Sequence, residues 1–343
     1  MNIRSCLLAI VIGILYSLNG WSQGAGVKRL DALSIDIEHS THDTDLVKAL
    51  NRSAYLLSRT DPQKGIEYSK IAITLSEQLN YDRGLAKALD NCALCNNVTG
   101  DTAVARSCAN RSLTIAQKIN DTACQVLALT RLGYITFWAK RQRQQARAYG
   151  EQALRLAQAT NNKESLAFAY MHMGFLLNKK KDISIAIKYD SLAIGLFDSL
   201  NDGYSKAGSL CNLGIEYYVL KDRKREIEID SIALKLLAPY GNTEYKAITL
   251  VCLSDCYYKQ HHYEQALTPY LEALAIDTRL GKKVQMADDN ARAAMALYKL
   301  QQYSAAAKHI NAALAIEHTL NDPLLFWYYS RIKKKIEKHL YAS

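Results

Sequence analysis

The sequence predicts an all-α protein: a right-handed solenoid of about seven helical hairpins, followed by a C-terminal capping helix. The chain has 343 residues with only four prolines and 49% hydrophobic content, a composition that favours helix. Similar segments end every 39 to 41 residues, at Asn80, Asn120, Asn161, Asn201, Asn242, Gly281 and Asn321. A fixed period of this length is typical of stacked helical repeats.

Small residues recur at three positions of each period. Two lie on the predicted second helix: Ala72, Ser112, Ala153, Ala193, Ala233, Ala273 and Ala313, and, seven residues earlier, Gly65, Ala105, Ala146, Ala186, Glu226, Ala266 and Ala306. The third lies on the helix before: Ser53, Ala93, Gly133, Gly174, Gly214, Ser254 and Ala294. Small side chains allow antiparallel helices to approach closely, so each unit is predicted to be a helical hairpin. Glu226 is the one clear exception.

The residues between helices mark the unit boundaries. The predicted units are 45–80, 81–120, 121–161, 162–201, 202–242, 243–281 and 282–321. Asparagines able to take the left-handed conformation follow the second helices, at Asn80, Asn120, Asn161, Asn201 and Asn321. Aspartates that can cap the next helix are Asp61, Asp121, Asp202 and Asp322, with Pro62 and Pro323 at first helical positions. Pro269 falls inside a predicted helix and should kink it.

The capping helix is predicted over residues 322–343. Its aromatic residues Phe326, Trp327 and Tyr328 are expected to cover the last hairpin, because a solenoid needs a terminal element that closes its core. Lys333 to Lys335 are expected to face water.

The N-terminus has the pattern of a secretory signal peptide over residues 1–23. Arg4 precedes an uncharged apolar run from Cys6 to Leu18, and small residues follow for cleavage near Gln23 to Gly26. Residues 24–44 are then a linker or partial helix. We expect an exported protein, periplasmic or secreted, without stable membrane insertion after cleavage. An uncleaved N-terminal anchor is the alternative, although the run is short for a membrane span.

The net charge of +10 is a weak indication of a nucleic-acid partner, because 33 acidic residues are interleaved with the basic ones. Export argues against nucleic acid as well. No nucleic-acid partner is therefore expected.

Two segments resemble the tetratricopeptide repeat family. Leu213-Gly214-Ile215-Glu216-Tyr217 and Leu253-Ser254-Asp255-Cys256-Tyr257 are similar to the Leu-Gly-x-x-Tyr core of its first helix, and the alanine columns are similar to its second. The resemblance covers roughly residues 45 to 321. The period near 40 resembles a longer bacterial variety of the repeat, since the commonest form has about 34 residues.

The resemblance implies that the first helices line a concave face that binds a protein or peptide. Positions just after the third small residue would point into it: Asn97, Tyr134, Phe137, Phe175, Asn178, Tyr218, Tyr258 and Tyr298. Tyr218, Tyr258 and Tyr298 are equivalent by the repeat and are expected to form a ladder. Aromatic side chains with polar tips suit a binding surface, but packing between hairpins is an equally open interpretation.

Basic residues gather at the turns inside the third, fourth and fifth hairpins. They are Lys140, Arg141, Arg143, Arg147, Lys179, Lys180, Lys181, Lys221, Arg223, Lys224 and Arg225. Since equivalent turns stack along one edge of a solenoid, these residues are predicted to form one basic ridge. The ridge could dock an acidic surface, or it could simply be a solvated edge.

Catalytic and metal-binding patterns are weak. Cys92 and Cys95 form a Cys-x-x-Cys pair inside a predicted helix, where a buried packing role is expected. Cys252, Cys256, His261 and His262 match no strong zinc pattern. There is no glycine-rich phosphate loop and no nucleophile elbow. We therefore expect no enzyme activity, no cofactor and no metal.

Together these patterns predict a protein- or peptide-binding repeat scaffold of the bacterial cell envelope. The alternative is the ligand-sensing half of a signalling system that acts on a membrane kinase or regulator.

Overall fold

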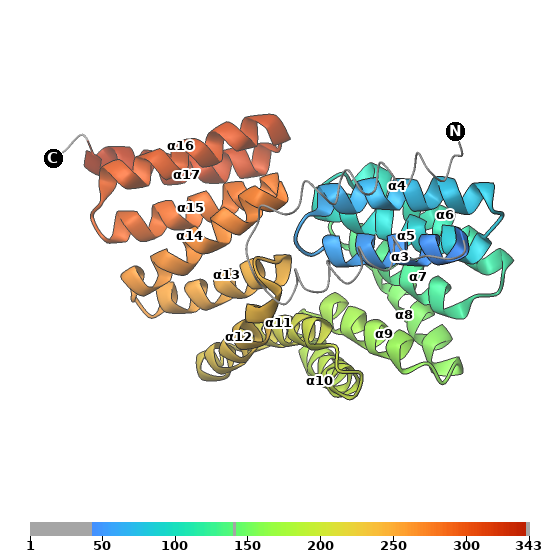
Figure 1. Ribbon diagram of the computed structural model, residues 1–343. Coiled ribbons are helices and arrows are strands. Elements are labelled where there is room, and N and C mark those ends of the chain that lie inside the picture. The colour runs from blue at the N-terminus through green and yellow to red at the C-terminus, as the bar shows by residue number, and fades with distance from the viewer. Residues whose placement is uncertain (1–42, 140–141, 341–343) are drawn as a thin grey trace.

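A computed structural model of the protein describes residues 43–139 and 142–340. Its α-helices follow one another with short connections (Figure 1): α3 (Asp43–Leu57), α4 (Pro62–Gln78), α5 (Asp82–Val98), α6 (Thr102–Lys118), α7 (Thr122–Phe137), α8 (Arg143–Ala159), α9 (Lys163–Leu176), α10 (Ile183–Ser199), α11 (Gly203–Leu220), α12 (Arg223–Leu237), α13 (Glu244–Lys259), α14 (Tyr263–Leu280), α15 (Lys283–Lys299), α16 (Tyr303–Leu320) and α17 (Pro323–Leu340). One 3₁₀ turn, η1 (Ala238–Tyr240), follows α12. Each helix packs against the next, which confirms the all-α solenoid.

The small residues hold the hairpins together. In the column Ala72, Ser112, Ala153, Ala193, Ala233, Ala273 and Ala313, every member is 0% exposed. The other two columns are also buried throughout. Glu226 is 0% exposed as well, and its carboxylate lies 2.6 Å from Arg223 on the same helix. The pattern therefore marks the faces where the two helices of a hairpin meet.

Most of the predicted helix ends are confirmed. Asn80, Asn120, Asn201 and Asn321 have φ between 51° and 54°, the left-handed conformation that stops a helix. Asn161 was wrongly predicted to do the same, because α8 already ends at Ala159 and Thr160 is extended.

The predicted aspartate caps form hydrogen bonds at helix starts. Asp61, Asp121 and Asp202 each accept a hydrogen bond from the backbone N–H three residues on. Asp322 accepts one from the N–H of Leu324. Helix α14 continues through Pro269.

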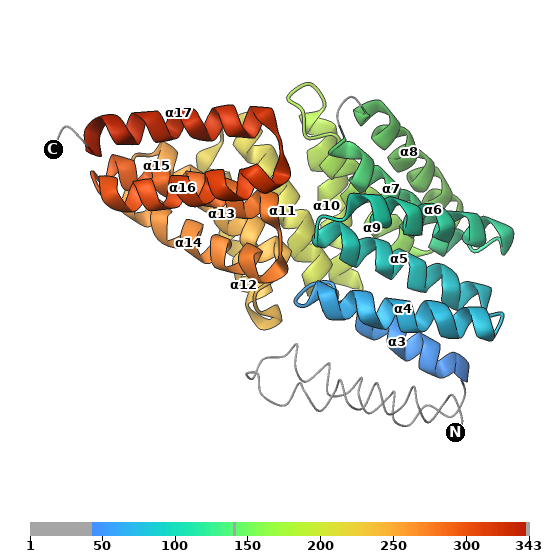
Figure 2. The same cartoon turned by 90° about the horizontal axis from the view of Figure 1, so that it is seen from above.

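The first helices of the hairpins form the inner layer of the array. Each of α3, α5, α7, α9 and α11 packs against the first helix of the next unit, up to α13. In the described part of the chain no comparable stacking joins successive second helices. In a curved two-layer array the more closely spaced layer lies on the concave side, and Figure 2 shows the resulting curved shape.

The C-terminal cap uses other residues than predicted. Tyr329 is 0% and Ile336 is 1% exposed, and they pack against the core of the last hairpin. Phe326, Trp327 and Tyr328 are between 42% and 62% exposed, so they are not the main cover of the hairpin, although the Phe326 ring lies 5.7 Å from that of His318 on α16. Leu325 and Ile332 pack against the same core, so the inward face of α17 runs through Leu325, Tyr329, Ile332 and Ile336.

The predicted signal peptide and most of the linker at 24–44 lie outside the described residues. Helix α3 begins at Asp43, two residues before the predicted start of the first unit at residue 45. Among the described helices, none combines the length and apolarity that a membrane span requires.

Candidate functional site: the inner face of the array

Three of the predicted binding residues form one aromatic cluster between units three and four. The ring of Phe175 on α9 lies 4.7 Å from that of Tyr134 and 4.6 Å from that of Phe137, both on α7. Phe137 is only 5% exposed, whereas its neighbour Trp138 is 66% exposed. The guanidinium carbon of Arg143 lies 4.7 Å from the Phe137 centroid. Phe137 therefore packs between hairpins, and its role as a partner contact stays a prediction.

The predicted tyrosine ladder is interrupted. Tyr218, Tyr258 and Tyr298 are half-buried on α11, α13 and α15, but among the described residues no ring contact joins any two of them. Lys259 lies 3.7 Å from the Tyr218 centroid, and Tyr263 lies 5.2 Å from Tyr258. Tyr258 thus packs against a ring at its own hairpin turn, whereas Tyr218 packs against Lys259 of the next hairpin. A partner contact by these rings stays a prediction.

The two predicted asparagines are also half-buried. Asn97 lies near the end of α5, and Asn178 follows the end of α9. Their place in a binding surface stays a prediction too.

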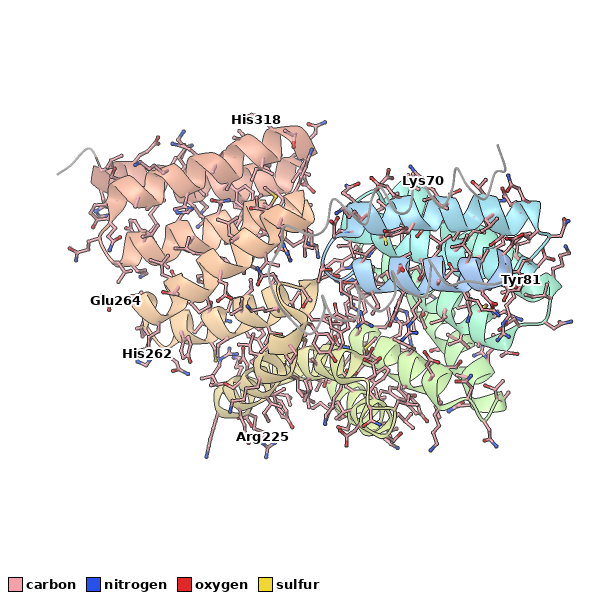
Figure 3. All side chains as sticks on the ribbon, in the orientation of Figure 1. Lys70, Tyr81, Arg225, His262, Glu264 and His318 are labelled. Atoms are coloured by element: carbon pink, nitrogen blue, oxygen red, sulfur yellow. The ribbon has the colours of Figure 1, made fainter. Side chains whose placement is uncertain are left out.

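The basic ridge is partly neutralised by ion pairs. Arg223 pairs with Glu226 at 2.6 Å, and Arg225, at the periphery in Figure 3, pairs with Asp222 at 3.5 Å. Arg147 pairs with Glu151 at 2.9 Å. The other described members are exposed: Arg143, Lys179, Lys180, Lys181, Lys221 and Lys224. Lys140 and Arg141 lie outside the described residues.

A contact that the sequence did not predict crosses the array. The guanidinium carbon of Arg59, in the turn after α3, lies 4.7 Å from the Tyr55 centroid and 4.0 Å from the Tyr204 centroid. Arg59 and Tyr204 are each 8% exposed. Tyr204 belongs to the fifth hairpin, and Figures 1 and 2 both show the first hairpin beside α11 and α13. Burial lowers the pKa of Arg279, on α14, and Asp61 of the first hairpin opposes that shift.

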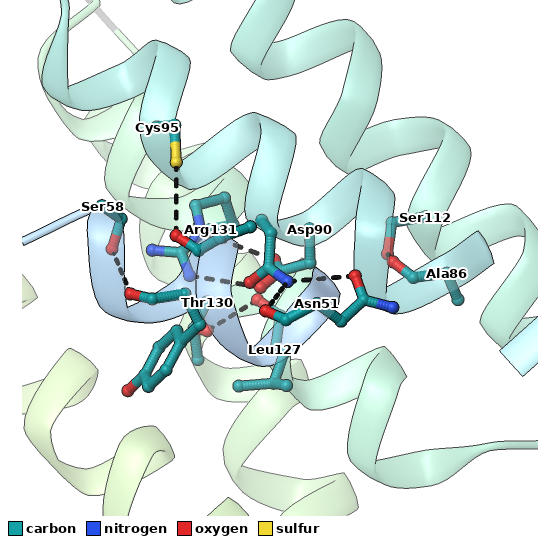
Figure 4. Close-up of polar contacts among 12 residues, drawn as sticks. Asn51, Ser58, Ala86, Asp90, Cys95, Ser112, Leu127, Thr130 and Arg131 are labelled. Atoms are coloured by element: carbon teal, nitrogen blue, oxygen red, sulfur yellow. Dashed lines mark hydrogen bonds and ion pairs between the residues drawn. The ribbon is translucent and has the colours of Figure 1, made fainter. Parts of the chain in front are cut away.

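A buried ion pair lies on the same inner face. Arg131 on α7 donates to both carboxylate oxygens of Asp90 on α5, at 3.4 and 3.2 Å (Figure 4). Their side chains are 18% and 8% exposed. Burial acts against the charge on Arg131, but Asp90 outweighs it, so the pKa of Arg131 is raised. This pair is held in one geometry by two hydrogen bonds.

A second ion pair joins units six and seven, and its charges act on a tyrosine of unit three. Lys282, the residue before α15, donates a hydrogen bond to Glu244, the first residue of α13. Burial raises the pKa of Tyr134 to about 12, with Glu244 adding to the shift and Lys282 opposing it. The contact of Arg59 with Tyr204 shows that side chains from nonconsecutive units meet on the inner face. We call Tyr55, Arg59, Asp90, Arg131, Tyr134, Tyr204, Glu244 and Lys282 the inner-face cluster.

Sequence reasoning missed most of this cluster. Arg59, Tyr204 and Lys282 lie in or beside the connections, at positions that do not repeat from unit to unit. Their convergence depends on the curvature accumulated over several hairpins, which no local pattern encodes. Tyr134 is the only member predicted.

Buried carboxyl groups lie between the hairpins of units four and five. Asp190 accepts a hydrogen bond from Asn212 through Oδ1 at 3.1 Å. Within the described residues, Oδ2 of Asp190 and both carboxylate oxygens of Glu216 and of Asp230 have no hydrogen-bond partner. Burial raises the pKa of Glu216 to about 8. Burial, with a contribution from Glu226, does the same for Asp230. These groups are therefore largely protonated at neutral pH.

Cys252, Cys256, His261 and His262 do not come together as metal ligands in the described structure. Within the described ranges, no three His, Cys, Asp or Glu side chains come together in a way that could hold a metal ion. Cys256 is buried, while His261 and His262 are exposed.

Comparison with known proteins identifies the fold. No protein-family model and no curated protein matches the sequence. The structure is similar to that of a Signal Transduction ATPase with Numerous Domains from Pyrococcus horikoshii, which has a tetratricopeptide repeat sensor. The TM-score is 0.59 at 14% identity, and the match covers 92% of this chain and 50% of that one. It also resembles the Cut9-Hcn1 hetero-tetramer of APC/C (TM-score 0.55, 18% identity; 89% and 58% covered).

A third similar structure spans nearly the whole chain. It is a Rap protein complexed with competence and sporulation factor (TM-score 0.52, 13% identity), with 98% of this chain and 94% of that one covered. The chain spans only about half the length of the first two structures. These likenesses show a tetratricopeptide-like α-solenoid.

Proposed function

We propose that the protein is a protein- or peptide-binding repeat scaffold of the bacterial cell envelope, without catalytic chemistry of its own. Its partner would bind the inner face of the first helices. The observation that carries the proposal is the inner-face cluster, in which charged and aromatic side chains from six hairpins gather on one side of the array.

The chemistry of that face suits recognition of a polypeptide. Arg131 and Asp90 present a fixed donor and acceptor pair, and tyrosines offer large rings with a polar tip. An extended segment has backbone donors and acceptors that such groups can bind. Two of the similar structures are complexes, the Rap protein with competence and sporulation factor and Cut9 with Hcn1, which supports the same class of function here.

Site-specific photocrosslinking tests the proposal. A photoreactive amino acid would replace Phe175 or Tyr258 on the inner layer, and in matched controls Glu264 or His318, which Figure 3 shows at the periphery. We expect a discrete crosslinked polypeptide from the inner positions only. Crosslinks only between copies of the chain, or equal capture from the outer positions, would contradict an inner binding face.

A combined variant tests the tyrosines. Replacing Tyr218, Tyr258 and Tyr298 together with alanine should abolish capture of the crosslinked partner while circular dichroism still shows a folded helical protein. Full capture by the folded variant would exclude these rings from the binding face.

The basic ridge is proposed as a secondary docking edge for an acidic surface. Lys179, Lys180 and Lys181 are exposed and form no ion pair with the described residues, so they can attract anions. Replacing all three with glutamine should weaken capture at low salt more than at high salt.

A ligand-sensing role is the second candidate. The contact of Arg59 with Tyr204 joins hairpins that are not neighbours, so the array has a point at which it can close or open. A ligand that binds one form better would shift that equilibrium, and a membrane kinase or regulator could read the change. A membrane protein among the crosslinked partners would favour this role.

A further inference from the structure

Two cysteines of the second hairpin face each other. The Sγ atoms of Cys92 on α5 and Cys108 on α6 lie 3.2 Å apart, and both are free thiols. Cys92 is 4% exposed and Cys108 is half-buried. Bonded sulfur atoms lie about 2 Å apart, so closure of a bond requires an approach of about 1 Å.

The repeat explains why these side chains meet. At the equivalent positions, Leu132 and Tyr149 share one core cluster in unit three, and Leu213 packs with Ile229 in unit five. The second hairpin has cysteine at both positions. The helices around the pair are lined with alanines that are 0% exposed: Ala93, Ala105 and Ala109. Close helix packing therefore holds the two sulfur atoms together.

The surroundings favour one thiolate in the pair. A hydrogen bond from Cys108 lowers the pKa of Cys92 against the effect of burial, and Lys70 and Asn96 lower it further. The Asn96 amide lies 3.4 Å from the Cys92 sulfur. The same hydrogen bond raises the pKa of Cys108, because that thiol keeps the shared proton. The first proton is thus lost from the coupled pair of thiols and not from one cysteine alone. The thiolate that remains is the nucleophile of thiol–disulfide exchange.

The Cys-x-x-Cys sequence is not the reactive pair. Cys95 is 0% exposed, burial raises its pKa to about 12, and its sulfur faces the carbonyl of Ala54 at 3.8 Å. Cys95 lies closer to Cys92 in the sequence, but it is Cys108 whose sulfur lies 3.2 Å from that of Cys92 in the structure.

We propose that Cys92 and Cys108 form a reversible disulfide that links the two helices of the second hairpin when the protein meets a disulfide oxidant. The thiolate of the pair attacks an external disulfide, forming a mixed disulfide and releasing one thiolate, which takes up a proton. The other cysteine loses its proton to solvent and attacks the mixed disulfide, which releases the second thiol. Two protein thiols are oxidised and one external disulfide is reduced to two thiols. The proposal is independent of the binding function.

Peptide mapping tests it on the purified full chain incubated with oxidised glutathione. Trypsin separates residues 88–106, which contain Cys92 and Cys95, from residues 107–111, which contain Cys108. We expect the two peptides to be joined, with the loss of two hydrogen atoms, and to separate after reduction.

Alanine variants identify the bonded atoms. The link should persist in Cys95→Ala and disappear in Cys92→Ala and in Cys108→Ala. A link between Cys92 and Cys95 would overturn the proposal. So would stable glutathione adducts without the joined peptides, or no oxidation of the folded chain under conditions that oxidise it after denaturation.

Discussion

Arg59 lies between the rings of Tyr55 and Tyr204, and thereby joins the first hairpin to the fifth. Stacked hairpins otherwise contact only their neighbours in this kind of array. A cation held against aromatic rings away from water contributes about 2 kcal/mol. The contact therefore couples two parts of the array that the chain itself keeps far apart.

Replacing Arg59 with alanine should open the array. Without the guanidinium, the first hairpin loses its hold on Tyr204, so the radius of gyration measured by small-angle X-ray scattering should increase. The free energy of unfolding should fall by about 2 kcal/mol. Arg59→Lys keeps a cation but not the planar stacking, and should give an intermediate result.

The matched control removes an arginine from the surface. Arg83 is 59% exposed and pairs with Asp121 at 2.9 Å, so Arg83→Ala should change neither the shape nor the stability appreciably. Equal scattering curves for the wild type and Arg59→Ala would show that the contact does not hold the array closed.

Two glycine substitutions should have opposite effects. A Cβ atom at Gly174 would lie 1.8 Å from Oδ2 of Asp190, whereas one at Gly195 would meet nothing within 4 Å. Gly174→Ala should destabilise the protein by about 3 kcal/mol through overpacking. Gly195→Ala, on the exposed side of α10, should stabilise it by about 0.5–1 kcal/mol through helix propensity. Chemical denaturation of the two variants checks both signs, and similar midpoints would contradict this packing.

The buried carboxyl groups predict that stability decreases as pH rises. Burial raises the pKa of Asp230 to about 8, with a smaller contribution from Glu226. The folded chain then holds a proton that the unfolded chain has released above about pH 4. Stability should therefore fall between about pH 4 and pH 8 and level off above. Unfolding free energies measured across this range should show the slope.

Asp230→Asn isolates this group. Asparagine has nearly the same shape and does not ionise, so the variant should lose part of the slope and be more stable than the wild type above pH 8, by an amount on the order of 2 kcal/mol. Asp198, which is exposed and pairs with Lys206, provides the control substitution Asp198→Asn. Parallel pH curves for wild type and Asp230→Asn would refute the assignment.

The proposed export predicts a defined mature N-terminus. After expression in a bacterium with a secretory pathway, the purified protein should begin between Gln23 and Gly26, as measured by intact mass. Retention of Arg4 in a membrane fraction would favour the uncleaved anchor.

Local patterns predicted the repeating part of the structure well. Ala153 and Ala193 occupy the close helix contacts because only small side chains fit there, and Asn201 ends α10 because asparagine tolerates the left-handed conformation. The prediction that Asn161 ends its helix in the left-handed conformation was wrong. The neighbouring Asn162 instead caps the start of the next helix, and the sequence pattern does not distinguish the two asparagines. The prediction that Trp327 covers the last hairpin was wrong, because the packing of α17 against α16 determines which face of α17 is buried.

The sequence by itself determined the class of fold, the hairpins and most of their ends, because each depends on interactions between residues close in the chain or repeated from unit to unit. The tertiary structure alone decided that Arg59 reaches Tyr204 and that Cys92 faces Cys108 rather than Cys95. The first depends on curvature summed over five hairpins, and the second on the register of two packed helices. Neither quantity is present in a local pattern of residue types.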